Sequence, residues 1–139
     1  MERTLVLIKP DAMQRDLAGA IISRLEKLGL KLVALKMLHP DKALAQRHYA
    51  VHKDKPFFND LVDYITSAPI AACVFEGNGA VETARRAMGA TDPAKAEKGT
   101  IRGDFGLSIE KNSVHGSDSP ANAEVEIKLF FSPNELFSY

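Results

Sequence analysis

The chain has 139 residues, about the length of one domain and enough to bury roughly two thirds of the surface that the unfolded chain exposes. Lys plus Arg and Asp plus Glu both number 18, so the formal net charge is zero and no basic excess is available for a nucleic-acid backbone or an anionic membrane. Cys73 is the only cysteine, which excludes an intrachain disulfide and a cysteine-based zinc site. No window approaches the roughly 20 apolar residues of a membrane span, and no signal sequence is visible. We therefore expect a single cytoplasmic domain over residues 1–139.

The first third of the chain predicts a strand, a helix and a second strand. Residues 4–9 predict a strand with an apolar run over 5–8, and the strand stops before Pro10 because proline cannot donate a ladder hydrogen bond. Apolar residues then recur at helical spacing as far as Gly29, which is the expected end of a helix. Residues 31–38 predict the second strand.

The middle of the chain predicts two helices, a third strand and another helix. Asp41 is placed to cap a helix that runs to about Val51, and apolar residues at i, i+3, i+4 and i+7 mark a second helix over 58–65. Residues 70–75 predict the third strand. Asn78 is the expected cap of the following helix, which a glycine closes.

The last third begins with a long stretch that has little periodicity. Residues 90–111 contain no clear element, and a stretch of that length in a compact domain is usually functional. Residues 113–115 predict a short strand, after which Ser119 and Pro120 offer the N-cap and first position of a final helix. The order of strands and helices is that of a split βαβ arrangement in an α+β fold.

Three cationic residues lie at element ends or next to glycines, where anions are commonly bound. Lys9 ends the first strand, and Arg85 lies on the helix after the third strand. Arg102 lies in a glycine-rich segment that lets backbone N–H groups approach a ligand. Each alone is more often a solvated surface charge, but together they favour a local polyphosphate site.

A histidine and a glutamate near the end of the chain suggest covalent chemistry. His115 ends the short last strand, and a neutral imidazole is nucleophilic near neutral pH without an external base. Glu126 borders the apolar stripe of the final helix, so it would be partly buried and would need a partner such as His115. The alternatives are a solvated loop histidine and a surface glutamate, and these two residues alone do not decide between them.

Five spaced blocks resemble nucleoside diphosphate kinases, in the order in which that family has them. They are residues 7–11 (LIKPD), 52–58 (HKDKPFF), 88–93 (MGATDP), 99–105 (GTIRGDF) and 112–119 (NSVHGSDS). The resemblance covers nearly the whole chain. It implies a ferredoxin-like βαββαβ fold of the α+β class, with a four-stranded antiparallel sheet and helices packed on it. It also implies Mg²⁺-dependent transfer of the γ-phosphate of a nucleoside triphosphate such as ATP to a nucleoside diphosphate, in the cytoplasm.

The resemblance further implies roles for individual residues. His115 corresponds to the phosphorylated histidine, so ping-pong kinetics are expected. Phe57 corresponds to the residue that stacks on the base, and a stack that does not inspect the base edge predicts broad base tolerance. Mg²⁺ is expected to be held mainly by substrate phosphates. The remaining expected site residues are Lys9, Arg85, Thr91 and Arg102 for the phosphates, Asn112 with Lys9 for the ribose, and Glu126, Ser117 and Tyr49 around the histidine.

The chain departs from the family pattern at a few positions. Asp16 stands where the family commonly has glycine, and Ser113 stands where an apolar residue is usual. Residues 134–139 do not match the tails associated with subunit contacts in the family. Members form hexamers or tetramers from a common dimer, and we expect a homo-oligomer, with a hexamer favoured over a tetramer.

Other classes of function fit the sequence less well. A non-catalytic nucleotide or nucleic-acid binding module on the same fold is the main alternative, and it would not need a nucleophilic histidine. A zinc site on His48 and His52, four residues apart, lacks an apparent third ligand. No P-loop motif occurs. We expect nucleoside di- and triphosphates as partners, with no obligatory nucleic acid and no membrane.

Overall fold

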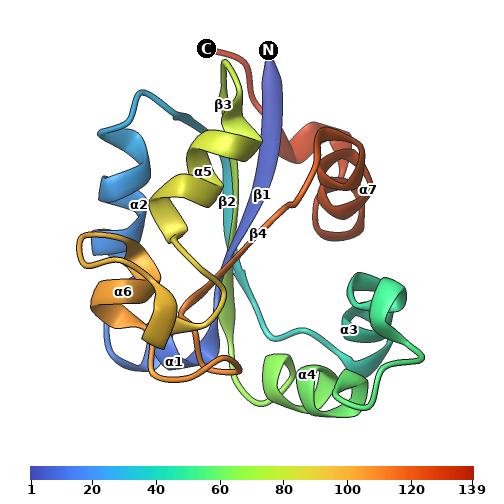
Figure 1. Cartoon of the computed structure of the whole chain (residues 1–139). Coiled ribbons are helices and arrows are strands. Elements are labelled where there is room, and N and C mark those ends of the chain that lie inside the picture. Colours follow the sequence, from blue (N-terminus) through green and yellow to red (C-terminus); the bar gives the residue numbers. More distant parts are fainter.

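The computed structural model describes residues 1–139, and it shows one four-stranded sheet with helices on both faces (Figure 1). The strands are β1 (Glu2–Ile8), β2 (Lys31–Leu38), β3 (Ile70–Gly77) and β4 (Val114–Gly116). Their order is β2-β3-β1-β4, and every pairing is antiparallel. This topology confirms the ferredoxin-like α+β fold that the sequence predicts.

The two central strands feed two separate cores, because successive side chains of a strand point to opposite faces. In β1, Leu5 and Leu7 enter one cluster of 14 buried residues, whereas Val6 and Ile8 enter another cluster of 14. Each fully buried aliphatic side chain contributes about 1.5–3 kcal/mol relative to exposure. The helices that cover the first face are α3 (Lys42–His48), α4 (Phe58–Ile65) and α7 (Pro120–Phe130); those on the second are α1 (Pro10–Gln14), α2 (Ala18–Glu26), α5 (Ala80–Met88) and α6 (Ile101–Phe105).

The helices α1 and α6 were not predicted from the sequence, and the helix predicted to start at Asp41 was too long. Each of the missed helices has only five residues, which is too short for a 3.6-residue period to show. In α6 the cap is Thr100, whose hydroxyl accepts a hydrogen bond from the Gly103 N–H at 3.1 Å. The helix capped by Asp41 ends at His48, and the chain continues as a 3₁₀ turn rather than as α-helix to Val51.

The predicted cap of α5 is wrong. Gly79, not Asn78, is the N-cap, and it adopts the left-handed conformation with φ of +58° that glycine reaches without strain. No side chain of the cap accepts a hydrogen bond. Instead the Glu2 carboxylate, from β1, accepts one from the Val81 N–H at 2.8 Å. A carboxylate at a helix N-terminus interacts favourably with the helix dipole. Glu2, on a neighbouring strand, therefore replaces a local side-chain cap for α5.

Two residues that depart from the family pattern are also the two non-glycine residues with positive φ. These are Asp16, at 60°, and Ser113, at 75°. Ser113 therefore cannot be part of a strand, and β4 runs from Val114 to Gly116 rather than over 113–115. The turn at Ser113 changes the direction of the chain immediately before β4 and so sets where His115 lies.

Among the helices of the fold, none combines the length and the hydropathy that a membrane span requires.

Candidate active site

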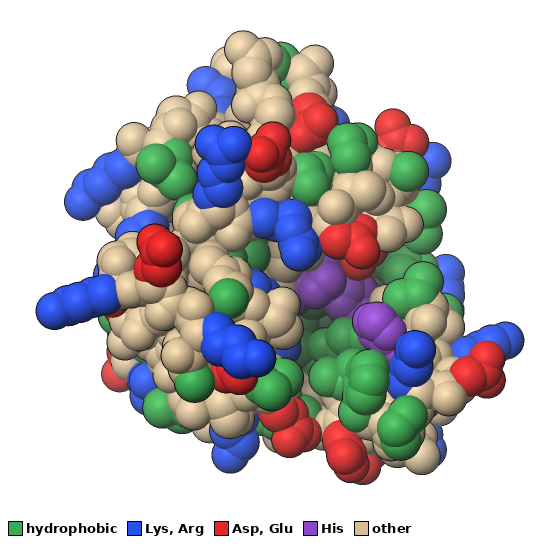
Figure 2. All heavy atoms as spheres, in the orientation of Figure 1, with side chains coloured by type: hydrophobic (Ala, Val, Ile, Leu, Met, Phe, Trp, Pro, Cys, Tyr) green, Lys and Arg blue, Asp and Glu red, His purple; other side chains and the backbone are tan.

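The site lies where β1 ends beside β4. His115 is paired with Leu7 across the two strands, and the backbone N–H of Lys9 donates to the Ser113 carbonyl at 2.9 Å. These contacts hold the end of β1 and the start of β4 side by side, so the Lys9 and His115 side chains emerge near each other. Figure 2 shows histidine side chains in a hollow at the centre of one face, with lysine and arginine side chains along one side of it.

His115 is held by a carboxylate through one of its two ring nitrogens. Its Nε2 lies 3.2 Å from Oε1 of Glu126, on α7. Ser117 donates its hydroxyl proton to the same oxygen at 2.6 Å, and its own oxygen accepts from the Leu5 N–H at 3.3 Å. Because an ionised carboxylate only accepts hydrogen bonds, the proton of neutral His115 must be on Nε2. The lone pair is then on Nδ1, the nitrogen available to attack a ligand.

Glu126 is ionised in this arrangement. Burial works to raise its pKa, but the hydrogen bond and charge of His115, together with the Ser117 hydrogen bond, leave the pKa below its ordinary value. The sequence-based pairing of Glu126 with His115 is confirmed by this contact.

His48, which the sequence suggested only as one half of a zinc pair with His52, lies directly against His115. It ends α3, its side chain is buried, and the two imidazole rings meet edge to face at 4.5 Å between centroids. Neither of its ring nitrogens has a hydrogen-bond partner. Burial, followed by the neighbouring His115, lowers its pKa to about 3, so His48 is neutral.

Lys9 is a buried cation with a defined partner. Its ammonium donates to Oδ1 of Asn112 at 2.9 Å, and the Asn112 amide donates in turn to the Thr91 carbonyl at 3.0 Å. Burial, and then repulsion from Arg102, lowers the pKa of Lys9 to about 8. Because its charged form is destabilised, binding of an anion nearby would stabilise the Lys9 ammonium.

Arg102 is the second buried cation, and it comes from α6 in the stretch that showed no periodicity. Its guanidinium donates to the backbone carbonyls of Gly89 and Val114, both at 3.0 Å, while its buried Nε–H has no partner. Burial, and then the charge of Arg85, lowers its pKa to about 10. The structure therefore places Arg102 within electrostatic reach of both Lys9 and Arg85, and repulsion among these cations favours a bound anion.

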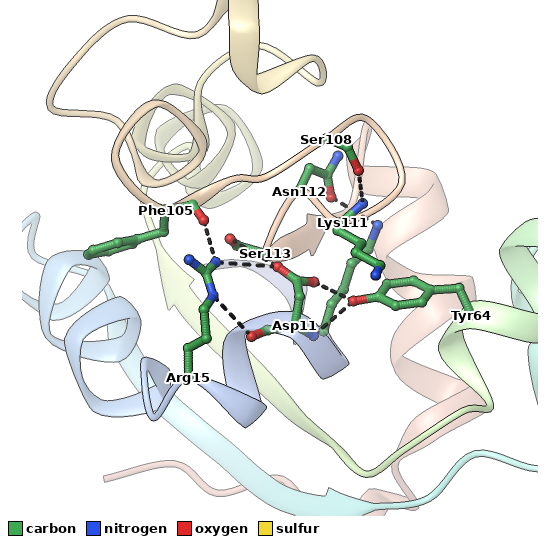
Figure 3. A network of polar contacts seen from close by, with 9 residues as sticks. Asp11, Arg15, Tyr64, Phe105, Ser108, Lys111, Asn112 and Ser113 are labelled. Atoms are coloured by element: carbon green, nitrogen blue, oxygen red, sulfur yellow. Dashed lines mark hydrogen bonds and ion pairs between the residues drawn. The ribbon is translucent and has the colours of Figure 1, made fainter.

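A polar network around Asp11 contacts Ser113 in the turn before β4 (Figure 3). Asp11, on α1, accepts a hydrogen bond from the Tyr64 hydroxyl at 2.7 Å, and its N–H donates back to the Tyr64 oxygen at 2.8 Å. The Ser113 hydroxyl reaches the other Asp11 oxygen at 3.4 Å, and Arg15 lies 3.6 Å from it. Sequence reasoning missed this network, because Asp11 and Tyr64 are 53 residues apart.

The remaining predicted residues lie at the edges of the site. Tyr49 is buried, with its ring 4.6 Å from that of His48, and burial followed by the charge of Glu126 raises its pKa. Phe57 directly precedes α4 and is 45% exposed. Thr91 and Arg85 are exposed as well, and no side-chain hydrogen bond holds either of them within the chain.

The only group of three metal-ligating side chains is His48, His115 and Glu126, whose ligand atoms all lie within 4.8 Å of one another. The considered pair of His48 and His52 forms no such group. His52 lies in the 3₁₀ turn after α3, where i, i+4 helical spacing no longer applies, and its ring instead packs 5.5 Å from that of Phe57.

Comparisons with known proteins point to one family. The family model "Nucleoside diphosphate kinase" matches residues 2–136. A nucleoside diphosphate kinase from Dehalococcoides mccartyi (strain 195) is 63% identical over all of this chain and 98% of its own length. One from Archaeoglobus fulgidus is 56% identical over all of this chain and 92% of its own length.

Solved structures agree with the sequence comparison. The nucleoside diphosphate kinase of Halobacterium salinarum, solved in complex with CDP, superposes with a TM-score of 0.97 at 50% identity, covering 99% of this chain and 92% of that one. The enzyme from Aquifex aeolicus superposes with a TM-score of 0.95 at 40% identity, covering 98% of this chain and 99% of that one.

Proposed function

Because this chain belongs to the nucleoside diphosphate kinase family and is a phosphotransferase, we propose that it moves the γ-phosphate of a nucleoside triphosphate to a nucleoside diphosphate through a phosphohistidine on His115. The observation that carries this proposal is the hydrogen bond of His115 Nε2 to Glu126, which leaves Nδ1 as the nucleophilic nitrogen. A site that only bound nucleotides would have no need for a histidine held in one tautomer.

The proposed reaction has two symmetric halves. In the first, the Nδ1 lone pair attacks the γ-phosphorus, a P–N bond forms, and the bond to the bridging oxygen of the leaving diphosphate breaks. Phosphorylated His115 is then cationic on the ring, and Glu126 is placed to stabilise that charge through Nε2–H. In the second half an acceptor diphosphate attacks the phosphorus and returns neutral His115. One site serves both halves, so the kinetics are ping-pong.

The cations supply most of the stabilisation of the transition state, in which charge spreads over the equatorial phosphate oxygens. Lys9 and Arg102 are already held by hydrogen bonds before a ligand arrives, so little reorganisation is needed. Arg85 is exposed beside them and is proposed to close on the phosphates. Asn112 positions Lys9 and is proposed, with it, to contact the ribose, while Thr91 is proposed to contact phosphate.

Members of this family generally use a divalent cation, and we propose Mg²⁺. The only cluster of three ligating side chains includes two imidazoles, which do not suit Mg²⁺, so no all-protein magnesium cage is available. Mg²⁺ therefore fits as part of the nucleotide complex, on phosphate oxygens that Lys9 and Arg102 hold. When bound it neutralises phosphate charge and orients the γ-phosphate.

Broad base tolerance is part of the proposal. The aromatic ring of Phe57 is 45% exposed, and every base has a π-face that can stack on such a ring. ATP, GTP and GDP are therefore all proposed as substrates. The Halobacterium salinarum relative was solved with CDP, a pyrimidine nucleotide, which supports a site that is not restricted to purines.

We also propose that residues 1–139 form one domain and that it assembles into a homo-oligomer, a hexamer rather than a tetramer, in the cytoplasm. Two cores that share one sheet support a single domain. The edge strand β2 carries Leu35 and Met37, which are 52% and 66% exposed, and such an edge is suited to pairing with another copy. Multi-angle light scattering would give the number of chains.

The decisive test is transfer of label through the protein. Wild type and His115→Ala are incubated with Mg²⁺ and γ-labelled ATP, freed of nucleotide, mapped, and then chased with GDP. Acid-labile label on His115 that passes to GDP is expected for wild type only. Intact ATP binding without any label would contradict the kinase mechanism and leave a nucleotide-binding module.

A further inference from the structure

One buried group next to His115 is not used by the proposed phosphoryl transfer. His48 has a side chain that is 1% exposed, and both of its ring nitrogens lack hydrogen-bond partners. A buried polar atom left without a partner is destabilising, so it calls for an explanation such as an ion. Its Nδ1 lies 3.9 Å from Oε2 of Glu126, the carboxylate oxygen that His115 does not use.

We propose that His48, His115 and Glu126 form a site for Zn²⁺, or a transition metal of similar ligand preference, and that metal bound there switches off phosphoryl transfer by changing the tautomer of His115. Binding of the metal is independent of any activity. The inhibitory consequence rests on the proposed role of His115 as the phosphorylated residue.

The ligand set suits zinc. Two imidazole nitrogens and one carboxylate are three ligands of the kind found in open tetrahedral zinc sites, in which water takes the fourth position. Zn–N and Zn–O bonds of about 2.0–2.2 Å place tetrahedral ligand atoms roughly 3.3–3.5 Å apart. His115 Nε2 lies 3.2 Å from Oε1 of Glu126, and His48 Nδ1 lies 3.9 Å from Oε2 of Glu126. Taking one ligand atom from each residue, all three lie within 4.8 Å of one another. Side-chain adjustments of about 1 Å would close the set.

The electrostatic state of the group also suits a metal. Neutral imidazole is the form that binds metals, and the buried His48 ring has two nitrogens without hydrogen-bond partners. Glu126 is ionised and supplies one negative charge to the site. His115 is partly exposed, at 22% of its side chain, which leaves an entry path and room for a water ligand. Mg²⁺, which requires oxygen ligands, should not compete for this site.

Inhibition follows because the neutral His115 ring has one proton and one free lone pair, shared between its two nitrogens. In the metal-free protein Glu126 holds the proton on Nε2 of His115, so the lone pair is on Nδ1. A metal on Nε2 uses the lone pair of that nitrogen, and the single proton of the neutral ring must move to Nδ1. No proton is gained or lost, but Nδ1 can no longer attack phosphorus. Lys9 and Phe57 make no hydrogen bond to the three ligands, and Lys9 keeps its bond to Asn112, so the groups proposed to bind phosphate and base remain in place.

The first arm of the test measures metal alone. Zn²⁺ binding to the intact protein is followed by competition with a chromophoric chelator, and Co²⁺ is used as a spectroscopic substitute. We expect one Zn²⁺ per chain and the intense visible absorption of tetrahedral Co²⁺. The variant His48→Phe keeps a buried ring of similar shape and removes one ligand, and His52→Phe removes a histidine that lies outside the site. His48→Phe should weaken Zn²⁺ binding by more than about 100-fold, beyond what second-shell losses cause, and His52→Phe should not weaken it.

A second arm needs no variant and reads the tautomer directly. Two-dimensional ¹H–¹⁵N spectra of the imidazoles should show His115 protonated on Nε2 without Zn²⁺ and on Nδ1 with it. His48 should shift too, while His39 and His52 should not. In parallel, Zn²⁺ should abolish formation of the phosphoenzyme, while equilibrium binding should show that nucleotide still associates with the Zn²⁺-loaded protein.

The outcomes separate the two proposals. Stoichiometric Zn²⁺ that needs His48 and moves the His115 proton establishes the site, even if the phosphohistidine mechanism fails. Absence of stoichiometric binding, binding that survives in folded His48→Phe, or ¹⁵N shifts confined to His39 and His52 would overturn it, whatever the kinase assay shows.

Discussion

The phosphate end and the base end of the site are built in opposite ways. The phosphate floor, which we define as Lys9, Arg102, Asn112, His115, Ser117 and Glu126, is largely buried, and every member has a hydrogen bond to a named partner. The base rim, which we define as Phe57, is exposed, and its side chain is not held by a hydrogen bond within the chain.

This difference assigns different tasks to the two regions. Donors that are fixed before binding stabilise charge in a transition state without reorganising, which raises the rate of chemistry. An exposed ring that only stacks contributes affinity and little discrimination, which suits the tolerance of many bases proposed above. Variants of the floor should therefore change kcat, and variants of the rim should change KM.

The sharpest test of the floor is Lys9→Met, which keeps the length of the side chain and removes its charge. The loss of one preorganised donor to phosphate should lower kcat by about 10²–10³-fold. Stopped-flow measurement of phosphoenzyme formation checks this, with Arg86→Met as the matched control, since Arg86 is an exposed cation paired with Glu82 on the same helix as Arg85. A change confined to KM would contradict the assignment of Lys9 to the floor.

Glu126→Gln should have the next largest effect. Gln keeps the shape and an oxygen for Ser117, but it loses the charge that stabilises phosphorylated His115. We expect kcat to fall about 10–100-fold with nucleotide affinity nearly unchanged. Single-turnover kinetics, together with equilibrium nucleotide binding, separate the two quantities. An unchanged rate of phosphorylation would show that the carboxylate only packs against the ring.

The floor was easier to predict from sequence than its supports. Glycine or proline directly follows each of His115, Lys9 and Arg102, and these turn-forming residues lie within the family motifs. The pairing of His115 with Glu126 was predicted because Glu126 borders the apolar stripe of the last helix. His48 could not be recognised in this way, because its burial depends on Phe130 and His115, which are far away in the chain.

Local backbone features were predicted least well, for physical reasons. The helix that carries Arg102 has five residues, so it shows no period, and its start is set by the side chain of Thr100. The cap of α5 comes from Glu2, on a strand 79 residues away, which no local pattern encodes. The bounds predicted for β4 were wrong by one residue, because no residue type around Ser113 indicates a positive φ there.

A variant of the rim tests the other half of the comparison. Phe57→Ala removes the stacking face, and base stacking on an aromatic ring is worth about 1–3 kcal/mol. Because the ring is 45% exposed, we expect the lower end, a rise in KM of about 5–10-fold with kcat nearly constant. The rise should be similar for ATP, GTP and CTP. A loss for one base only would mean that the rim reads base edges rather than providing a common stacking surface.

The smallest expected effect is a change in pH dependence that belongs to the floor alone. Burial, and then Arg102, lowers the pKa of Lys9 to about 8, so the free enzyme should lose the Lys9 charge as pH rises through this value. The kcat/KM profile should fall by half near pH 8, and about tenfold per unit above it, because it reports the free enzyme. Bound phosphate favours charged Lys9, so the corresponding limb in kcat should lie at higher pH.

The variant Lys9→Arg keeps the charge and should flatten the alkaline limb of the kcat/KM profile even if its maximal rate is lower, whereas Phe57→Ala should retain that limb. An alkaline limb that persists in Lys9→Arg would assign the titration to another group and remove Lys9 from the set of charges that bind phosphate.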